Sequence, residues 1–419
     1  MNIFERILGL LKKRKSVISY TSGSLFNSFA QIISNIIILS YVKPDELGIW
    51  NSLLLFETYS LFLQGGIING LNRELPYYLG KNDKEYAKSL AGNALFFFII
   101  SILLCLLVGI VLYLYYKQEA LIFKLTLIGI VIITITKFYE NYLTSTFRSS
   151  HSFQKLSKAY FFRGIYLLIS VLFVVFYDYK GYIVRMVTTA LFTSLFLHFI
   201  RPIKAKPKFS FPEISLLFKV GFPIFILSYI YQTSSTVDRL FLIKFSNFEI
   251  VGFYSLGFMA YSSFKSLPLS LANYIYPKMT YTFGSTNDTK LLIKQAFKVN
   301  ITIFLIMLPI AILGYFLLPL VIPLFFPKYV QGIEAAQILL FAAVMAGSTI
   351  GVNAIWSMKI WKYIVPIQLM GASMNVVAIY TGIKVINNPL VGASIGVLFS
   401  QFIYVIITNS FLLLVKKHA

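Results

Sequence analysis

Long apolar runs recur along the whole of this 419-residue chain. Each run holds about 20 residues, which as a helix is enough to cross the ~30 Å hydrocarbon core of a bilayer. A spanning run of this length is helical because hydrocarbon offers its backbone no outside hydrogen-bond partner. Charged residues make up only 12% of the chain, whereas about a quarter is usual in soluble domains. The sequence therefore predicts an all-α polytopic membrane protein.

Twelve such runs can be separated, with ends placed to within about 4 residues. They are 17–40, 49–71, 89–115, 120–146, 159–177, 181–200, 216–243, 250–276, 292–315, 331–356, 362–385 and 389–415. Prolines at 309, 319, 323 and 327 are expected to bend or break the helix in the stretch 300–330. The connections are short, so we expect one membrane-embedded unit without a separate soluble domain.

An internal correspondence relates the two halves when the sequence is shifted by 204 positions. The matched pairs include Gly48 and Gly252, Trp50 and Tyr254, Asn69 and Asn273, and Gly80 and Gly284. Six helices per half is an even number, so both halves enter the membrane in the same orientation. We therefore expect twelve transmembrane helices in two six-helix lobes related by a pseudo-two-fold axis along the membrane normal. The basic, proline-containing stretch Arg201–Pro212 is the expected linker, with lobes of residues 1–204 and 205–419.

The net charge of +22 follows from topology rather than from nucleic-acid binding. If the N-terminus is cytoplasmic, alternate loops and tails on that side hold 22 basic residues and the opposite side holds 6. The first group is Arg6, Lys12, Lys13, Arg14, Lys15, Arg73, Lys81, Lys84, Lys88, Arg148, Lys155, Lys158, Arg201, Lys204, Lys206, Lys208, Lys278, Lys290, Lys359, Lys362, Lys416 and Lys417; the second is Lys43, Lys117, Lys180, Lys244, Lys328 and Lys384. Basic residues accumulate on the cytoplasmic side of membrane proteins. Both termini are therefore expected in the cytoplasm, and no nucleic-acid partner is expected.

Polar residues form a stripe on one face of the first helix of each half. Their spacing of three and four places them on one side of the helix. The stripes include Asn27, Gln31 and Asn35 in the first half, and Gln232, Ser235, Asp238 and Arg239 in the second. Hydrogen bonding between helices is one explanation. Because the stripes run for several turns and recur in both halves, we favour a water-filled cleft between the lobes.

Charged residues inside the hydrocarbon are a sharper indicator of function, because each is costly unless paired or hydrated. Lys265 lies near the middle of its run, and Glu57 lies about 12 Å into the second helix at 1.5 Å per residue. Lys137 and Glu140, three residues apart, are expected to pair with each other. Arg163 is expected to extend to the cytoplasmic face and Arg185 to anchor at the outer interface. Lys265 is thus the leading candidate for a substrate contact.

Motifs for catalysis, nucleotide binding or metal binding are not found in the sequence. There is no Walker loop, no GxSxG elbow and no HExxH, and the three histidines lie far apart. Cys105 is alone within an apolar run and is expected to be a buried thiol. We therefore expect a non-enzymatic protein without cofactor or metal.

Several short segments together give the chain a family resemblance. They are Glu46-Leu47-Gly48-Ile49-Trp50, Gly70-Leu71-Asn72-Arg73-Glu74-Leu75-Pro76-Tyr77-Tyr78, Lys219-Val220-Gly221-Phe222-Pro223, Asp238-Arg239 and Gly252-Phe253-Tyr254. With these segments the chain resembles the Wzx-type O-antigen and capsule repeat-unit flippases of the MOP exporter superfamily. The resemblance implies alternating access and export of undecaprenyl-diphosphate-linked oligosaccharide units, used in lipopolysaccharide or capsule synthesis, across the cytoplasmic (inner) membrane.

The residue types also indicate how a cargo of that kind could be bound. Cations in a low-dielectric cleft attract a diphosphate strongly. The candidate substrate-binding residues are Lys265, Arg239, Asn27, Gln31, Asn35, Gln232 and Ser235, and the candidates for ion coupling or ion pairing are Glu57 and Asp238. The coupling ion, H⁺ or Na⁺, is left open, and polysaccharide polymerase machinery is a candidate partner. Three alternatives remain: a multidrug cation antiporter, an exporter of another lipid-linked glycan, and a membrane polysaccharide polymerase or ligase.

The charge bias makes a direct prediction of topology. A cysteine replacing Lys206, in the expected linker, should resist an impermeant thiol reagent added to intact cells, whereas one replacing Lys180 should react. Both should react after the membrane is permeabilised. The reverse pattern in intact cells would overturn the topology.

Overall fold

The computed structural model describes residues 23–417, in which every regular element is a helix. The side chains of eleven of these residues are outside the description: Leu267, Ser270, Asn273, Tyr274, Pro277, Lys278, Thr280, Tyr281, Gly284, Ser285 and Lys417. The basic run at residues 12–15 also lies outside the described residues. The first described helix is Gly23–Tyr41.

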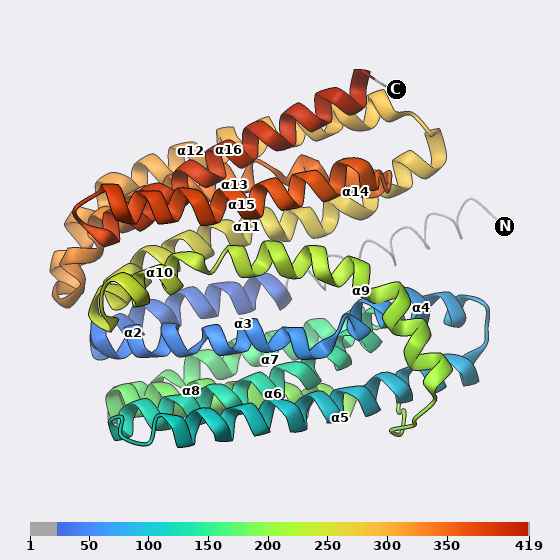
Figure 1. Ribbon diagram of the computed structural model, residues 1–419, viewed down its shortest axis with the longest axis horizontal. Helices are drawn as coiled ribbons and strands as arrows, with labels where there is room; N and C mark the ends of the chain where they lie inside the picture. The colour runs from blue at the N-terminus through green and yellow to red at the C-terminus, as the bar shows by residue number, and fades with distance from the viewer. Residues whose placement is uncertain (1–22, 418–419) are drawn as a thin grey trace. The chain divides into compact units, whose positions relative to one another are not determined.

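The remaining elements follow it in chain order (Figure 1). They are α2 (Pro44–Leu53), α3 (Leu55–Ser60), η1 (Leu61–Gln64), α4 (Ile67–Gly80), α5 (Lys84–Tyr115), α6 (Leu121–Ser149), α7 (Phe153–Ile169), α8 (Val171–Ile200), α9 (Phe211–Ser234), α10 (Val237–Phe245), α11 (Phe248–Thr286), α12 (Thr289–Phe325), η2 (Pro327–Gly332), α13 (Ile333–Gly347), η3 (Ile350–Val352), α14 (Asn353–Ser357), α15 (Trp361–Val385) and α16 (Pro389–Lys417).

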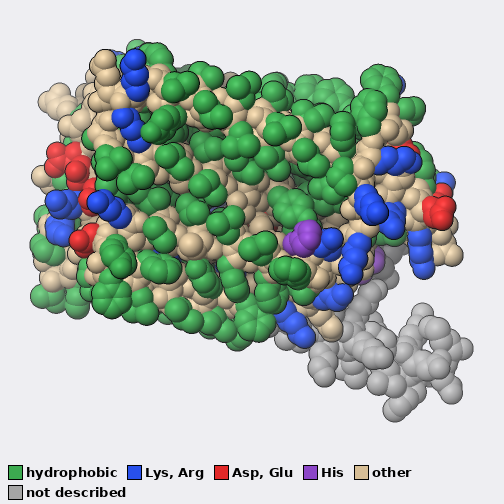
Figure 2. Space-filling model, turned by 90° about the horizontal axis from the view of Figure 1, so that it is seen from below, with side chains coloured by type: hydrophobic (Ala, Val, Ile, Leu, Met, Phe, Trp, Pro, Cys, Tyr) green, Lys and Arg blue, Asp and Glu red, His purple; other side chains and the backbone are tan. Residues whose placement is uncertain are grey.

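Helices long and apolar enough to cross a membrane account for most of this chain. Between residues 23 and 417 there are nine such segments, with bounds Gly23–Tyr41, Lys84–Tyr115, Leu121–Ser149, Val171–Ile200, Phe211–Ser234, Thr289–Phe325, Pro327–Ser357, Trp361–Val385 and Pro389–Lys416. On the face drawn in Figure 2, hydrophobic side chains cover most of the surface and charged side chains gather at its two ends. The chain is an all-helical, multi-pass membrane protein, as the apolar runs predict.

Four of the predicted runs differ in detail from the helices that form. Run 49–71 is a series of short helices, because the left-handed residues Gly65 and Gly66 interrupt it. Run 159–177 is broken between α7 and α8, whereas its predicted boundary with run 181–200 is confirmed by a tight turn at Asp178 (φ 48°, ψ −129°) inside α8. Run 216–243 is broken between α9 and α10. Run 331–356 is broken between α13 and α14.

Of the two outcomes expected of the prolines in the stretch 300–330, bending or breaking the helix, a break occurs only after Phe325. Pro309, Pro319 and Pro323 all lie inside the continuous helix α12, and only Pro327 begins a new element, η2. Proline is tolerated in transmembrane helices because neighbouring groups can satisfy the carbonyl that loses its partner.

Three long helices begin at side chains that cap their first turn. The carboxylate of Asp83 accepts from the backbone N–H of Tyr86 at the start of α5, over 3.0 Å. Asn247 and Asp288 cap α11 and α12 in the same way, each over 2.9 Å. Capping supplies acceptors to N–H groups that have no partner within the helix. These residues therefore set where the helices begin.

By the density of internal contacts the chain divides into two units. Unit 1 holds residues 1–42 and 53–229, and unit 2 holds 43–52 and 230–419. Most of α2 thus belongs to unit 2, and most of α9 to unit 1. Within unit 1, α5, α6, α8 and α7 pack in succession; within unit 2, α11, α13, α16 and α15 do the same.

In unit 1, the expected linker is held against the start of α5. The backbone N–H of Lys208 donates to the carbonyl of Gly92 over 3.2 Å, and that of Ser210 donates to Asn93 Oδ1 over 2.5 Å. Glu213, at the start of α9, accepts from Ser89 Oγ at 2.8 and 3.0 Å and from Asn93. The stretch 201–212 is therefore hydrogen-bonded to α5 rather than lying free of it.

In unit 2, α2 crosses α11 at two glycines that the 204-residue shift pairs. A Cβ on Gly48 would lie 1.7 Å from the carbonyl oxygen of Phe248, and one on Gly252 would lie 1.7 Å from that of Pro44. One turn further on, Asn51 Nδ2 donates to Ser255 Oγ over 2.6 Å, again between residues 204 apart. Small residues allow helices to approach this closely in membranes. The contact supports the repeat register.

The crossing predicts a strong size limit at Gly252. Gly252→Ala would press a methyl group against a backbone carbonyl, which cannot rotate away, so we expect destabilisation of about 1–3 kcal/mol. The readout is the apparent melting temperature of the purified protein in detergent. Gly80→Ala is the control, since nothing lies within 4 Å of a Cβ there. Equal melting temperatures for the two variants would contradict the crossing.

Candidate functional site

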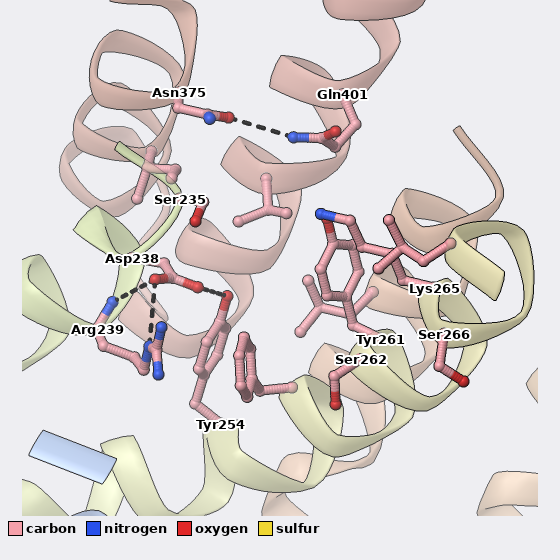
Figure 3. A pocket seen from close by; sticks show the side chains of 15 residues that line it. Ser235, Asp238, Arg239, Tyr254, Tyr261, Ser262, Lys265, Ser266, Asn375 and Gln401 are labelled. Atoms are coloured by element: carbon pink, nitrogen blue, oxygen red, sulfur yellow. Dashed lines mark hydrogen bonds and ion pairs between the residues drawn. The ribbon is translucent and has the colours of Figure 1, made fainter. Parts of the chain in front are cut away.

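A cavity of about 250 Å³, lined by both polar and apolar side chains, lies within unit 2 (Figure 3). Its walls come from the α9–α10 junction and from α10, α11, α13, α15 and α16. Fifteen residues line it: Ser235, Asp238, Arg239, Tyr254, Phe258, Tyr261, Ser262, Lys265, Ser266, Leu269, Leu339, Asn375, Ile379, Val397 and Gln401. With Asp238, Arg239 and Lys265 ionised, their formal charges sum to +1. The cavity is therefore suited to an anionic or polar ligand.

The break between α9 and α10 forms one wall. Thr236 leaves the helical conformation (φ −110°, ψ 0°), and its N–H donates to the carbonyl of Thr233 over 3.0 Å in a tight turn. The chain then restarts as α10, with Asp238 in the first turn. A carboxylate is favoured there because the first N–H groups of a helix carry partial positive charge.

Asp238 and Arg239 form a buried pair that is bonded on both sides. Asp238 Oδ1 accepts from the backbone N–H of Arg239 over 2.8 Å and lies 3.7 Å from Arg239 Nε. Asp238 Oδ2 accepts from Tyr254 Oη over 2.7 Å. The Arg239 guanidinium lies over the ring of Phe258, 4.3 Å from its centre. The two charges thus pair within the cavity wall, although Arg239 Nε is buried without a hydrogen-bond acceptor among the described residues.

Lys265 lies about halfway along α11 and is only partly buried. Its Nζ donates to Tyr261 Oη over 3.3 Å and lies 5.2 Å from the centre of the same ring. Among the described residues no carboxylate lies within ion-pair distance of it. A charge half-way along a membrane helix is costly without a counter-charge or water. Lys265 therefore presents a cation whose charge no described carboxylate balances.

Two amides complete the cavity from α15 and α16. Gln401 Nε2 donates to Asn375 Oδ1 over 3.3 Å, and Asn375 Nδ2 donates to Ser234 Oγ over 3.2 Å. Figure 3 shows the first of these bonds on the opposite side of the cavity from the Asp238 pair. The cavity thus holds charged groups and neutral hydrogen-bonding groups.

The candidate residues named from the sequence fall into two sets. Ser235, Asp238, Arg239 and Lys265 all line this cavity, whereas Gln232 is exposed and does not. The other set, Asn27, Gln31, Asn35 and Glu57, belongs to unit 1. There Gln31 Nε2 donates to Asn35 Oδ1 over 2.8 Å on the same helix, and Asn27 Oδ1 is buried without a hydrogen-bond donor.

Unit 1 also contains buried charges that pair with one another. Lys137 Nζ lies 3.5 Å from Glu140, which confirms the predicted pair. The expectation for Arg163 is wrong: instead of extending to water, it lies 3.6 Å from the same carboxylate. Glu57 is in electrostatic range of all three groups. One carboxylate thus pairs with two bases, which leaves a formal charge of +1 on the three groups.

The expectation that Arg185 anchors at an interface is also wrong. The residue is fully buried, and its Nη2 donates to the carbonyl of Leu167 over 3.3 Å. The turn at Asp178 folds the two parts of α8 against each other, with the Cβ position of Gly181 only 1.8 Å from the carbonyl oxygen of Phe173. The reversal lies at the predicted boundary between runs 159–177 and 181–200, but the packing that buries Arg185 against Leu167 is not visible in the sequence.

Eleven of the fifteen lining residues are absent from the sequence-based candidates, and these include four that form hydrogen bonds with other lining side chains: Tyr254, Tyr261, Asn375 and Gln401. Asn375 and Gln401 are polar residues in the middle of apolar runs, the same signal that drew attention to Lys265. The two tyrosines carry no such signal in a chain with 28 of them. Among the described residues, no three His, Cys, Asp or Glu side chains are grouped closely enough to hold a metal ion.

The buried pair predicts that Asp238 and Lys265 differ in their structural roles. Asp238→Ala should cost about 3–5 kcal/mol of stability, because it leaves the Arg239 charge buried without its partner. Lys265→Ala should leave the apparent melting temperature near that of the wild type, since no ion pair is lost. Similar large losses in both variants would show that Lys265 is structural.

Comparisons with known proteins bear on the fold and the family. The family model described as "Polysaccharide biosynthesis protein" matches residues 42–331. The comparison of the sequence with curated proteins found no match. Solved structures match over nearly the whole chain.

An inward-facing multidrug resistance MATE transporter of the MOP superfamily has a TM-score of 0.74 at 14% identity, covering 96% of this chain and 99% of its own. The lipid II flippase MurJ, inward closed, has a TM-score of 0.70 at 17% identity, with coverages of 96% and 87%. A variant MATE transporter from Vibrio cholerae has a TM-score of 0.59 at 14% identity, with coverages of 95% and 96%.

The resemblance drawn from the short sequence segments is thereby confirmed. At these identities the structural matches establish the fold, and the family model covers more than half of the chain. The chain belongs to the polysaccharide biosynthesis protein family and has the fold shared by MATE and MurJ transporters of the MOP superfamily.

Proposed function

We propose that this protein is a flippase that moves undecaprenyl-diphosphate-linked oligosaccharide repeat units across the cytoplasmic membrane by alternating access. The observation that carries the proposal is Lys265, a cation without a described counter-ion that lines a cavity of a membrane protein. A lipid-linked diphosphate supplies the missing negative charge. The family, whose members are described as polysaccharide biosynthesis proteins, supports a glycan cargo.

The fold supports transport rather than synthesis. Both kinds of solved relative, a multidrug transporter and a lipid II flippase, move molecules across a membrane. In our proposal twelve helices form two lobes, residues 1–204 and 205–419, related by a pseudo-two-fold axis, with both termini in the cytoplasm. The glycine crossing between residues 204 apart supports that symmetry.

The charges in the cavity favour an anionic cargo over the alternative of a multidrug cation antiporter. Lys265 and Arg239 outnumber Asp238, whose carboxylate already has Arg239 and Tyr254 as partners. A cationic drug would meet a repulsive field at this depth, where charges interact strongly. An anionic lipid-linked glycan therefore fits this cavity better than a cation does.

Glu57 is a better candidate than Asp238 for the residue that binds the coupling ion. Asp238 is committed to its pair, whereas Glu57 forms no ion pair with any described residue. Its environment contains Lys137, Glu140 and Arg163, so a change in its charge would alter the balance of a buried cluster. We propose Glu57 as the residue that takes up the coupling ion, H⁺ or Na⁺.

The proposal predicts loss of export without loss of protein when Lys265 is neutralised. Lys265→Ala should abolish export and cause lipid-linked units to accumulate on the cytoplasmic leaflet, at normal protein levels. Lys265→Arg should retain part of the activity because it keeps the charge. The measurement is the sidedness of labelled lipid-linked units in spheroplasts, with Lys244→Ala as a control outside the cavity.

Full export by Lys265→Ala would remove this residue from the site. Units that reach the outer leaflet unpolymerised in a deletion strain would instead indicate a polymerase.

A further inference from the structure

The carbonyl oxygen of the Gln401 side chain is a buried acceptor without a donor. Gln401 is 5% exposed, lines the cavity from α16, and its Oε1 has no hydrogen-bond partner among the described residues. Buried polar atoms are nearly always hydrogen-bonded, and leaving one unpaired costs free energy. An unpaired atom on a cavity wall therefore points to a partner that occupies the cavity.

A relay of three hydrogen bonds fixes which end of the amide is unpaired. Ser234 Oγ donates its only proton to the carbonyl of Tyr231 over 2.7 Å, so it must accept from Asn375 Nδ2. Asn375 then presents Oδ1 towards α16, where it accepts from Gln401 Nε2. Rotating the Gln401 amide would bring two oxygens together. Gln401 is thus held with Oε1 as the open end.

The missing partner must be a donor and is not a metal ion. A single amide oxygen is a poor cation site, and the ionised groups of the cavity already carry a net charge of +1. A hydroxyl or an amide N–H meets the requirement without adding positive charge. The ligand of this cavity therefore carries an anionic group for Lys265 and a neutral donor for Gln401.

The size of the cavity limits how much of a ligand it holds. About 250 Å³ is slightly below the ~300–1,000 Å³ of typical small-molecule pockets. A whole lipid-linked oligosaccharide does not fit in this space, whereas a phosphate group with the sugar attached to it matches it in scale. The cavity therefore suits the junction between the diphosphate and the first sugar.

We propose that Gln401 is a specificity-determining residue, whose Oε1 accepts a hydrogen bond from a hydroxyl or acetamido N–H of the sugar joined to the diphosphate. This rests on the proposed function, because it assumes that Lys265 holds the diphosphate. Asn375 and Ser234 act as positioning residues that bond the other end of the Gln401 amide and so leave Oε1 as its unpaired end.

The test compares two phosphate monoesters: glucose 1-phosphate, whose sugar carries hydroxyl donors, and ethyl phosphate, whose alkyl group carries none. Binding of each to the full-length protein in nanodiscs is measured by saturation-transfer NMR titration. The wild type should bind glucose 1-phosphate about 10-fold more tightly, the contribution of about one hydrogen bond. Gln401→Met should bring the two affinities together while leaving that for ethyl phosphate unchanged.

Three further variants test whether Gln401 itself causes the difference in affinity between the two probes. Gln368→Met, which alters a buried glutamine of α15 outside the cavity, should keep the 10-fold ratio. Gln401→Glu replaces the Nε2 donor with a second oxygen and so breaks the bond to Asn375 Oδ1 that positions the acceptor, so it should lose the ratio while its added charge weakens the binding of both probes. Lys265→Ala should weaken the binding of both probes by the same factor.

Each other outcome has a distinct meaning. A ratio that survives in Gln401→Met, a loss of ethyl phosphate binding in that variant, or a wild type without preference would overturn the inference about Gln401. If Lys265→Ala binds both phosphates as tightly as the wild type, the proposed anion contact fails instead.

Discussion

The hydrocarbon core of a membrane gives an unpaired polar group nothing to bond, and this constraint governs both the backbone and the charges of this protein. Long helices satisfy their backbone groups internally, so the chain is built almost entirely of them. Irregular backbone in membrane proteins must lie against protein rather than lipid. Gly66, where the second run is interrupted, lies against Gly221 of α9, with a Cβ position 2.9 Å from backbone atoms there.

The same constraint explains why most of the buried charges are paired. Glu140 is shared by Lys137 and Arg163, Asp238 is bonded to Arg239 and Tyr254, and Arg185 donates to a backbone carbonyl. Pairing of this kind offsets the cost of removing charges from water. Arg185 and Lys265 both have only neutral described partners, but Arg185 is packed in the interior of unit 1, whereas Lys265 lines a cavity and contacts the hydroxyl of Tyr261. A charge that the protein leaves uncompensated in a cavity is better explained by a ligand than by packing.

The cavity also illustrates how a transporter can distinguish a cargo while still releasing it. An uncompensated lysine provides attraction that depends on charge, which any lipid-linked diphosphate would satisfy. In our proposal, the oriented amide of Gln401 adds a smaller preference that depends on the attached sugar. Because the amide relay runs through α9, α15 and α16, any movement of one of these helices would change the direction of the acceptor. Binding specificity and conformation are therefore linked in this part of unit 2.

The sequence alone determined the membrane class, most helix positions and the family, because hydrophobic run length and residue order are local properties. It also identified Ser235, Asp238, Arg239 and Lys265, whose unusual polarity within apolar runs is visible without a structure. Only the tertiary structure decided which charges are paired, since Arg163 and Arg185 meet partners from other helices. It likewise revealed Asn375 and Gln401 as part of the same cavity, 110 or more residues from Lys265 in sequence. Apolar periodicity places a residue in a helix, but the partner it faces depends on how the helices pack.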